Sequence, residues 1–90
     1  MNKNKIPFIF SSHALKELER RKISRTVVDS VVAAPEQKVH EHGEIVCYQS
    51  KIKMVGHSYL LRVMVNEIKK PPLIVTVYRT SKIDKYWRKK

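Results

Sequence analysis

Residues 73–90 read LIVTVYRTSKIDKYWRKK, and this stretch decides how the chain can fold. Its first half is rich in β-branched and aromatic residues, the composition of a β-strand. Side chains alternate across a strand, so one face begins apolar and should meet the core, while the other carries hydroxyl groups. The apolar face comprises Leu73, Val75, Val77 and Arg79. The second face comprises Ile74, Thr76, Tyr78 and Thr80.

Residues 82–90 continue this strand as a basic tail that contains Tyr86 and Trp87. A sheet face that gains cationic and aromatic groups toward its end is suited to holding a nucleic-acid strand, because aromatic rings stack on bases. Two interpretations of the tail stay open here. Its aromatic rings either stack on bases or anchor the tail on the core.

The length, charge and cysteine content of the chain limit which classes of function are plausible. The chain has 90 residues, which we interpret as a single domain, 1–90, and Lys and Arg outnumber Asp and Glu by 19 to 8, for a net charge of +11. Such a charge attracts nucleic acid, an anionic membrane surface or an acidic protein. No apolar run reaches the length of a membrane helix, and we recognise no secretory signal, so we predict no membrane association and a cytoplasmic location. The single cysteine, Cys47, fits a reducing compartment and is interpreted as a small core residue.

The order of the expected elements predicts an α+β domain. Residues 1–5 are expected to be a mobile lead-in, and residues 6–10 either a short edge strand or an extended arm. Serines at positions 11, 12 and 24 precede two expected helices, 13–21 and 25–34, because a serine hydroxyl can accept a free N–H of the first turn. We expect these helices to form a hairpin packed on a twisted antiparallel sheet of three to four strands. The expected strands are 39–42, 45 to 54 or 55, 59–66 and 73–80.

Metal and cofactor chemistry find little support in the sequence. The histidines are His13, His40, His42 and His57, and two of them are spaced to chelate, but no cysteine pair or carboxylate cluster completes a site. The two glycines cannot build a phosphate-binding loop. We therefore predict no metal and no cofactor.

The remaining polar groups suit cleavage of RNA by its own 2′-hydroxyl. That reaction needs a base, an acid and a cation that stabilises the phosphorane. Arg62 lies within a strong predicted strand, and its side chain points to the opposite face from the apolar residues on either side of it. Tyr78 can lie on the same side of the sheet as Arg62. His13, at the start of the first helix, can point into the same cleft, and histidine is a common general base or acid. Alternatively, Arg62 pairs with Glu44 or Glu67, and His13 and Tyr78 are solvated.

Further cations could hold the RNA backbone. Lys51 and Lys53 alternate on one face of the middle strand, where they either grip phosphates or form a solvated face. Arg79, Lys82 and Lys85 extend the basic character to the end of the chain. We predict that these five residues bind RNA.

Three motifs give the chain a resemblance to a known family. FSSHAL at 10–15 with RKIS at 21–24, YLLRV at 59–63 and TVYRTSK at 76–82 resemble small RelE-like proteins catalogued as a domain of unknown function. The resemblance runs from about residue 6 to residue 87. It implies a RelE/ParE-like toxin fold, and hence the toxin of a type II toxin–antitoxin pair that cleaves mRNA, often on the ribosome. It also implies an acidic antitoxin protein as a partner.

The resemblance implies roles residue by residue. Arg62 is similar to the family's phosphate-binding arginine, and Tyr78 and Arg79 to the polar residues that end the last strand. Lys51 and Lys53 fit basic residues of the middle strand. His13 matches a histidine that many RelE relatives lack.

The predicted function is therefore a metal-independent endoribonuclease toxin, an mRNA interferase, with His13, Arg62 and Tyr78 as catalytic residues. Two alternatives stay open: a non-catalytic basic module that binds nucleic acid or protein, and a gyrase inhibitor, because relatives of the same fold include gyrase poisons.

Overall fold

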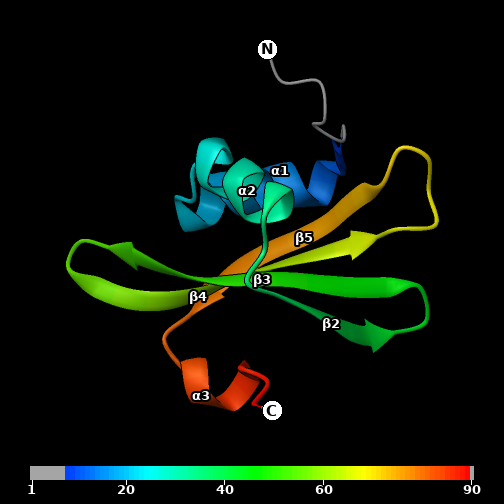
Figure 1. Ribbon diagram of the computed structural model, residues 1–90. Helices are drawn as coiled ribbons and strands as arrows, with labels where there is room; N and C mark the ends of the chain where they lie inside the picture. The colour runs from blue at the N-terminus through cyan, green and yellow to red at the C-terminus, as the bar shows by residue number, and fades with distance from the viewer. Residues whose placement is uncertain (1–7, 90) are drawn as a thin grey trace.

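A computed structural model describes residues 8–89 of the chain, shown in Figure 1. The expected lead-in at residues 1–5 lies outside the described residues. The elements are, in order, β1 (Ile9–Phe10), α1 (Ser12–Arg21), α2 (Arg25–Ala33), β2 (Gln37–His42), β3 (Ile45–Met54), β4 (His57–Asn66), β5 (Leu73–Thr80) and α3 (Ile83–Tyr86). No helix among residues 8–89 is long and apolar enough to cross a membrane.

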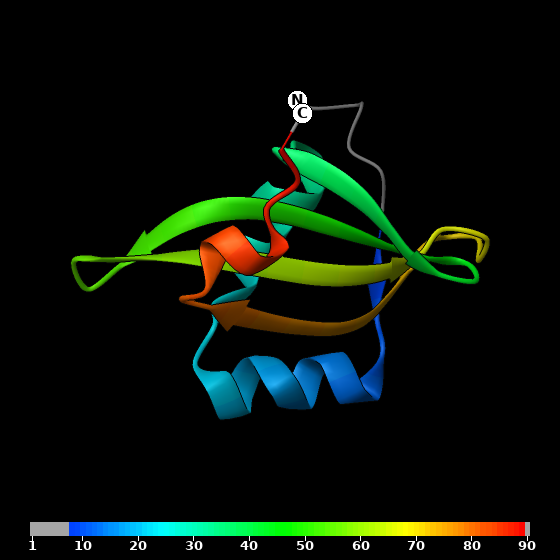
Figure 2. The ribbon, with the colours of Figure 1, turned by 90° about the horizontal axis from the view of Figure 1, so that it is seen from below.

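The structure is α+β, with one five-stranded sheet in the order β1-β5-β4-β3-β2. The helices α1 and α2 lie on one face of the sheet and α3 lies on the other (Figures 1 and 2). The prediction of three to four antiparallel strands was wrong, because the sheet has one more strand at its edge and that strand is parallel to its neighbour. Residues 9–10 add β1 in parallel to β5, held by bonds from the Ile9 N–H to the Pro72 carbonyl and from the Ser11 N–H to the Ile74 carbonyl, both 3.0 Å. The sheet is therefore mixed.

Serines cap both main helices as the sequence indicates, although α1 begins at residue 12, one residue earlier than expected. The hydroxyl of Ser11 accepts a hydrogen bond from the N–H of Ala14 at 3.0 Å, and that of Ser24 accepts one from the N–H of Val27 at 3.1 Å. Each bond satisfies an N–H that has no partner inside its helix. The predicted helical hairpin is not confirmed, since α1 packs chiefly on β5 and α2 on β3 and β4.

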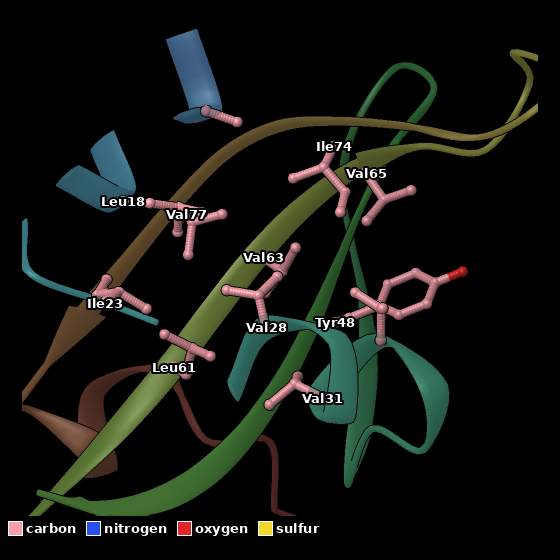
Figure 3. Close-up of a cluster of buried hydrophobic side chains, with 12 residues drawn as sticks. Leu18, Ile23, Val28, Val31, Tyr48, Leu61, Val63, Val65, Ile74 and Val77 are labelled. Atoms are coloured by element: carbon pink, nitrogen blue, oxygen red, sulfur yellow. The ribbon is translucent and has the colours of Figure 1, made fainter. Parts of the chain in front are cut away.

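The core fills the layer between the sheet and the two helices (Figure 3). Leu18 of α1 and Val28 and Val31 of α2 meet Leu61 and Val63 of β4 there. Alternation along β4 sends its odd-numbered apolar residues toward the helices, and its even-numbered residues therefore face the other way. This placement positions Arg62 away from the core.

A β-bulge in β5 changes which face its first residues occupy, relative to the faces predicted from alternation. Met64 pairs with Thr76, but the next residue of β4, Val65, pairs with Ile74, so Val75 is the extra residue. Ile74 is consequently buried in the core, although the alternation pattern placed it on the hydroxyl-bearing face. After the bulge the pattern holds, and Val77 faces the helices.

We predict that Leu61→Ala lowers the free energy of unfolding by about 2–5 kcal/mol, because it opens a cavity in a closely packed layer. Leu61 is 0 % exposed. The matched control is Leu15→Ala on α1, which removes the same atoms from a side chain that is 44 % exposed and should cost less than about 1 kcal/mol. Urea unfolding followed by circular dichroism measures both. Equal losses would contradict this location of the core.

Candidate functional site

Arg62 is a cation buried in the sheet face opposite to α1 and α2. It is 3 % exposed, at the middle of β4. A guanidinium removed from water is unfavourable unless its N–H groups find partners. Its surroundings should therefore be built from acceptors.

All three nitrogens of the Arg62 guanidinium donate hydrogen bonds. Nε donates to Oε1 of Gln49 at 2.8 Å, Nη1 donates to the hydroxyl oxygen of Tyr78 at 2.7 Å, and Nη2 donates to Oε2 of Glu41 at 2.9 Å. Burial by itself lowers the pKa of Arg62, but the bonds to Tyr78 and Glu41 help to raise it above its usual value. The guanidinium is therefore charged and fully held by the chain.

Tyr78 sits directly beside Arg62 because the two residues are partners in the pairing of β4 with β5. The prediction that they share one side of the sheet is confirmed. Burial raises the pKa of Tyr78 above its ordinary value and outweighs the opposing effect of the Arg62 guanidinium. The phenol is thus protonated at neutral pH and can act as a proton donor.

The C-terminal segment covers this pair. The ring of Tyr86, in α3, lies 4.4 Å from the Arg62 guanidinium carbon, measured to the ring centroid. Nε2 of Gln49 donates to the carbonyl of Tyr86 at 3.2 Å, and the side chain of Gln37 exchanges two hydrogen bonds with the backbone of Arg88. Figure 2 shows α3 lying across the sheet on this face.

The aromatic residues of the tail act as anchors in this structure. Nζ of Lys51 lies 4.1 Å from the centroid of the Trp87 ring, and both Tyr86 and Trp87 are half-buried. The rings thus hold the tail on the face of Arg62 and not on the core, as the anchoring interpretation had it, because the core lies on the other side of the sheet.

Most of the predicted RNA-binding cations lie on the side of Arg62. Lys51 and Lys53 share the face of Gln49 in β3, and Lys82 and Lys85 belong to the C-terminal segment; all four are exposed. Arg79 does not join them. It lies two residues after Val77 on the helix side, where its Nη1 donates to the carbonyl of Arg21 at 2.5 Å.

His13 is not brought to Arg62. It lies exposed in the first turn of α1, and α1 packs on the opposite face of the sheet. The expectation that His13 points into the same cleft as Arg62 and Tyr78 is therefore wrong, because the sheet itself separates them.

Sequence reasoning missed the acceptors around Arg62. The expected partners were Glu44 or Glu67, but Glu67 instead accepts hydrogen bonds from Tyr48 and, at 3.1 Å, from Lys38. Gln49 was detectable in principle, since it pairs with Arg62 across β3 and β4. Glu41 was not, because it reaches the guanidinium from β2, two strands away.

Metal-ligand side chains do not gather at this site. Among residues 8–89, no three His, Cys, Asp or Glu side chains are grouped so that they could hold a metal ion. Cys47 is buried beside Gln49, as expected for a core residue, and burial raises the pKa of its thiol to about 11.

The site thus defines an α+β domain with a covered arginine–tyrosine pair on the sheet face away from its two main helices. The chain belongs to the family described as Domain of unknown function (DUF4258), which matches residues 10–79. That match includes Arg62 and Tyr78 and ends before α3. No curated protein and no solved structure matches the chain. The family assigns no activity.

A second group of charges lies at the end of α1. Oε1 of Glu17 accepts hydrogen bonds from Nη2 of Arg20 at 2.9 Å and from Nε of Arg21 at 2.5 Å. These bonds, with that from Arg20 the larger influence, lower the pKa of Glu17 from 4.5 to about 2. The carboxylate is therefore ionised at all but strongly acidic pH.

We predict that Glu41→Gln lowers the free energy of unfolding by about 1–3 kcal/mol, because it leaves the buried guanidinium without a charged acceptor. The control is Glu44→Gln, which removes the same charge from an exposed residue with no ion pair among the described residues. Urea unfolding at neutral pH measures both. Identical unfolding curves for the two variants would contradict the importance of the Glu41 bond.

We predict that Glu17 contributes to stability above about pH 4.5 and that this contribution is lost as the pH falls toward about 2, because its pKa is lower in the folded chain than in the unfolded one. Between roughly pH 5 and pH 2, the interval that spans the pKa of Glu17 in the unfolded and folded chains, the wild-type protein should therefore lose more stability than Glu17→Gln. Glu19→Gln, on an exposed side chain of the same helix, should follow the wild type. Urea unfolding across this range checks it, and parallel curves for wild type and Glu17→Gln would refute it.

Proposed function

We propose that the protein is an endoribonuclease toxin of a toxin–antitoxin pair and that it cleaves mRNA, on or off the ribosome. The observation that carries this proposal is the hydrogen-bonded pair of Arg62 and Tyr78 on the sheet face away from α1 and α2. A cation and a proton donor 2.7 Å apart are two of the three groups that cleavage by a 2′-hydroxyl requires. The resemblance to RelE-like proteins supports the same reaction.

The proposed reaction divides the work between these residues. The 2′-oxygen of RNA forms a bond to phosphorus as the bond to the 5′-oxygen breaks, which gives a cyclic phosphate and a free 5′-hydroxyl. Arg62 stabilises the negative charge of the phosphorane, and Tyr78 donates its proton to the leaving 5′-oxygen. These steps use no metal ion. The 2′ proton passes to solvent water, because His13 lies across the sheet and is not placed to accept it.

Access to the pair requires α3 to move. Tyr86 covers the guanidinium, and Glu41 occupies the position that a phosphate oxygen would take. RNA must therefore displace the C-terminal segment and replace the carboxylate as the acceptor. The net charge of +11 favours RNA for this exchange and also favours an acidic antitoxin as the protein partner.

A second candidate function is a non-catalytic module that binds nucleic acid. The observation that favours it is a difference in accessibility: the Arg62 nitrogens are all hydrogen-bonded within the chain, whereas the lysines around it are exposed. Lys53, Lys82 and Lys85 are exposed and reach a phosphate backbone without any rearrangement. Binding of this kind needs neither Arg62 nor Tyr78.

We predict that Tyr78→Phe lowers the rate of RNA cleavage by about 10²–10⁴-fold, because it removes the proton donor, while RNA affinity changes by less than about twofold. The control is Tyr48→Phe, which removes a phenol from the helix side of the sheet. Purified protein and end-labelled mRNA supply the assay, and circular dichroism confirms that both variants fold. Arg62→Lys, which keeps the charge but loses the planar fork, should also impair cleavage.

The same assay separates the two candidates. Wild-type protein that binds RNA and leaves it intact, in vitro and after induction in cells followed by primer extension on mRNA, would rule out the nuclease and support the binding module. Cleavage that survives in Tyr78→Phe would remove the phenol from the mechanism. Absence of both binding and cleavage would overturn both candidates.

A further inference from the structure

A basic pocket of about 540 Å³ lies on the other side of the sheet, where the end of α1 meets the end of β5. Four cations line it: Arg20, Arg21, Lys22 and Arg79. The first three come from the last turn of α1 and the residue that ends it, and the fourth comes from β5. Segments distant in sequence thus converge to place positive charge around one hollow.

The charge of this pocket is only partly neutralised. Glu17 is the carboxylate that pairs with Arg20 and Arg21, and it accepts from both. Lys22 and Arg79 have no carboxylate partner among residues 8–89. Four cations and one carboxylate leave a strongly positive hollow, which favours an anion.

Arg79 is held in place before any ligand arrives. Its Nη1 donates to the carbonyl of Arg21 at 2.5 Å, and its guanidinium carbon lies 5.4 Å from the centroid of the Tyr59 ring. A guanidinium has five N–H donors in a planar fork, so these contacts leave donors for a phosphate. Fixing the fork in advance reduces the entropy that binding must overcome.

The remaining lining residues suit a nucleotide. Ser81 carries a hydroxyl group and Tyr59 supplies an aromatic ring next to the cations, whereas the hydroxyl of Thr80 already accepts a hydrogen bond from the Lys82 N–H at 3.0 Å. Pockets that hold small molecules typically span about 300–1,000 Å³, so this one exceeds the needs of a single anion such as phosphate. Phosphate, sugar and base together match its size and its mixture of groups.

We propose that this pocket binds the phosphate group of a nucleotide, either free or within a single-stranded RNA. Arg79 and Lys22 contact the phosphate, and Tyr59 lies beside the base. The pocket lies on the helix side of the sheet, and Arg62 faces the other side. The proposal therefore goes beyond the proposed cleavage and does not depend on it.

The test is an NMR titration of the full chain at low salt with four probes: adenosine 5′-monophosphate, adenosine, inorganic phosphate and a ten-nucleotide single-stranded RNA. We expect the mononucleotide to shift the amide signals of Lys22 and Ser81 saturably, and adenosine to leave them unchanged. The combined variant Lys22→Gln and Arg79→Gln should weaken mononucleotide binding by about tenfold or more. For the ten-nucleotide RNA it should also lower the log–log salt slope by about 0.7 per lost phosphate contact.

The matched control is Lys16→Gln with Lys69→Gln, which removes the same charge from exposed residues outside the pocket and should change affinity by less than about twofold. Lys22→Gln alone, on an exposed side chain, keeps the test valid if substitution of Arg79 disturbs folding. Arg79→Lys should recover only part of the affinity, because lysine lacks the fork.

Each result decides the question. The proposal would be overturned if the control pair weakened binding equally or if the titration did not saturate. It would also be overturned if adenosine bound as tightly as its monophosphate, or if inorganic phosphate bound as tightly as both nucleotide probes. Tighter binding of the RNA than of the mononucleotide would identify a nucleic-acid strand as the source of the phosphate, and the reverse would identify a free nucleotide. Cleavage assays on Tyr78→Phe are independent of all these outcomes.

Discussion

The burial of the Arg62 guanidinium is the constraint on which the rest of this structure depends. A cation that is 3 % exposed must have its hydrogen bonds supplied by the protein. That requirement explains why an amide, a phenol and a carboxylate converge on one sheet face, from β3, β5 and β2. It also explains why α3 lies there, since the Tyr86 ring excludes water from the guanidinium while its carbonyl accepts from Gln49.

The sheet separates two kinds of chemistry because side chains alternate along its strands. Leu61 and Val77 face α1 and α2 and build the core, whereas Arg62 and Tyr78 face α3. Arg79 follows Tyr78 and therefore returns to the helix side, where it lines a pocket with the end of α1. Two adjacent residues of β5 thus contribute to two unrelated polar sites on opposite faces.

The sequence predicts those features that depend on near neighbours. The serine caps of α1 and α2 and the shared face of Arg62 and Tyr78 follow from local chemistry and from one hairpin. The sequence offered residues 6–10 as a short edge strand, but their parallel pairing with β5 could not be predicted, because it joins segments more than sixty residues apart. The alternation pattern also did not reveal the bulge at Val75. Glu41 was missed because it reaches Arg62 from β2, two strands away in the sheet. His13 was misplaced because tertiary packing decides which side of the sheet α1 covers.

The C-terminal segment that covers Arg62 links the proposed cleavage to the exposed lysines around it, because one of them also contacts that segment. Lys51 interacts with the Trp87 ring, so a phosphate that draws Lys51 away weakens a contact that holds the C-terminal segment in place. A ligand shifts such an equilibrium only through its differential affinity for the two states. A state in which the C-terminal segment has moved would offer an additional cation, Arg62, so a polyanion would favour it over the covered state. RNA that first meets the outer lysines would in this way promote exposure of the arginine–tyrosine pair, whereas a ligand without phosphates would not.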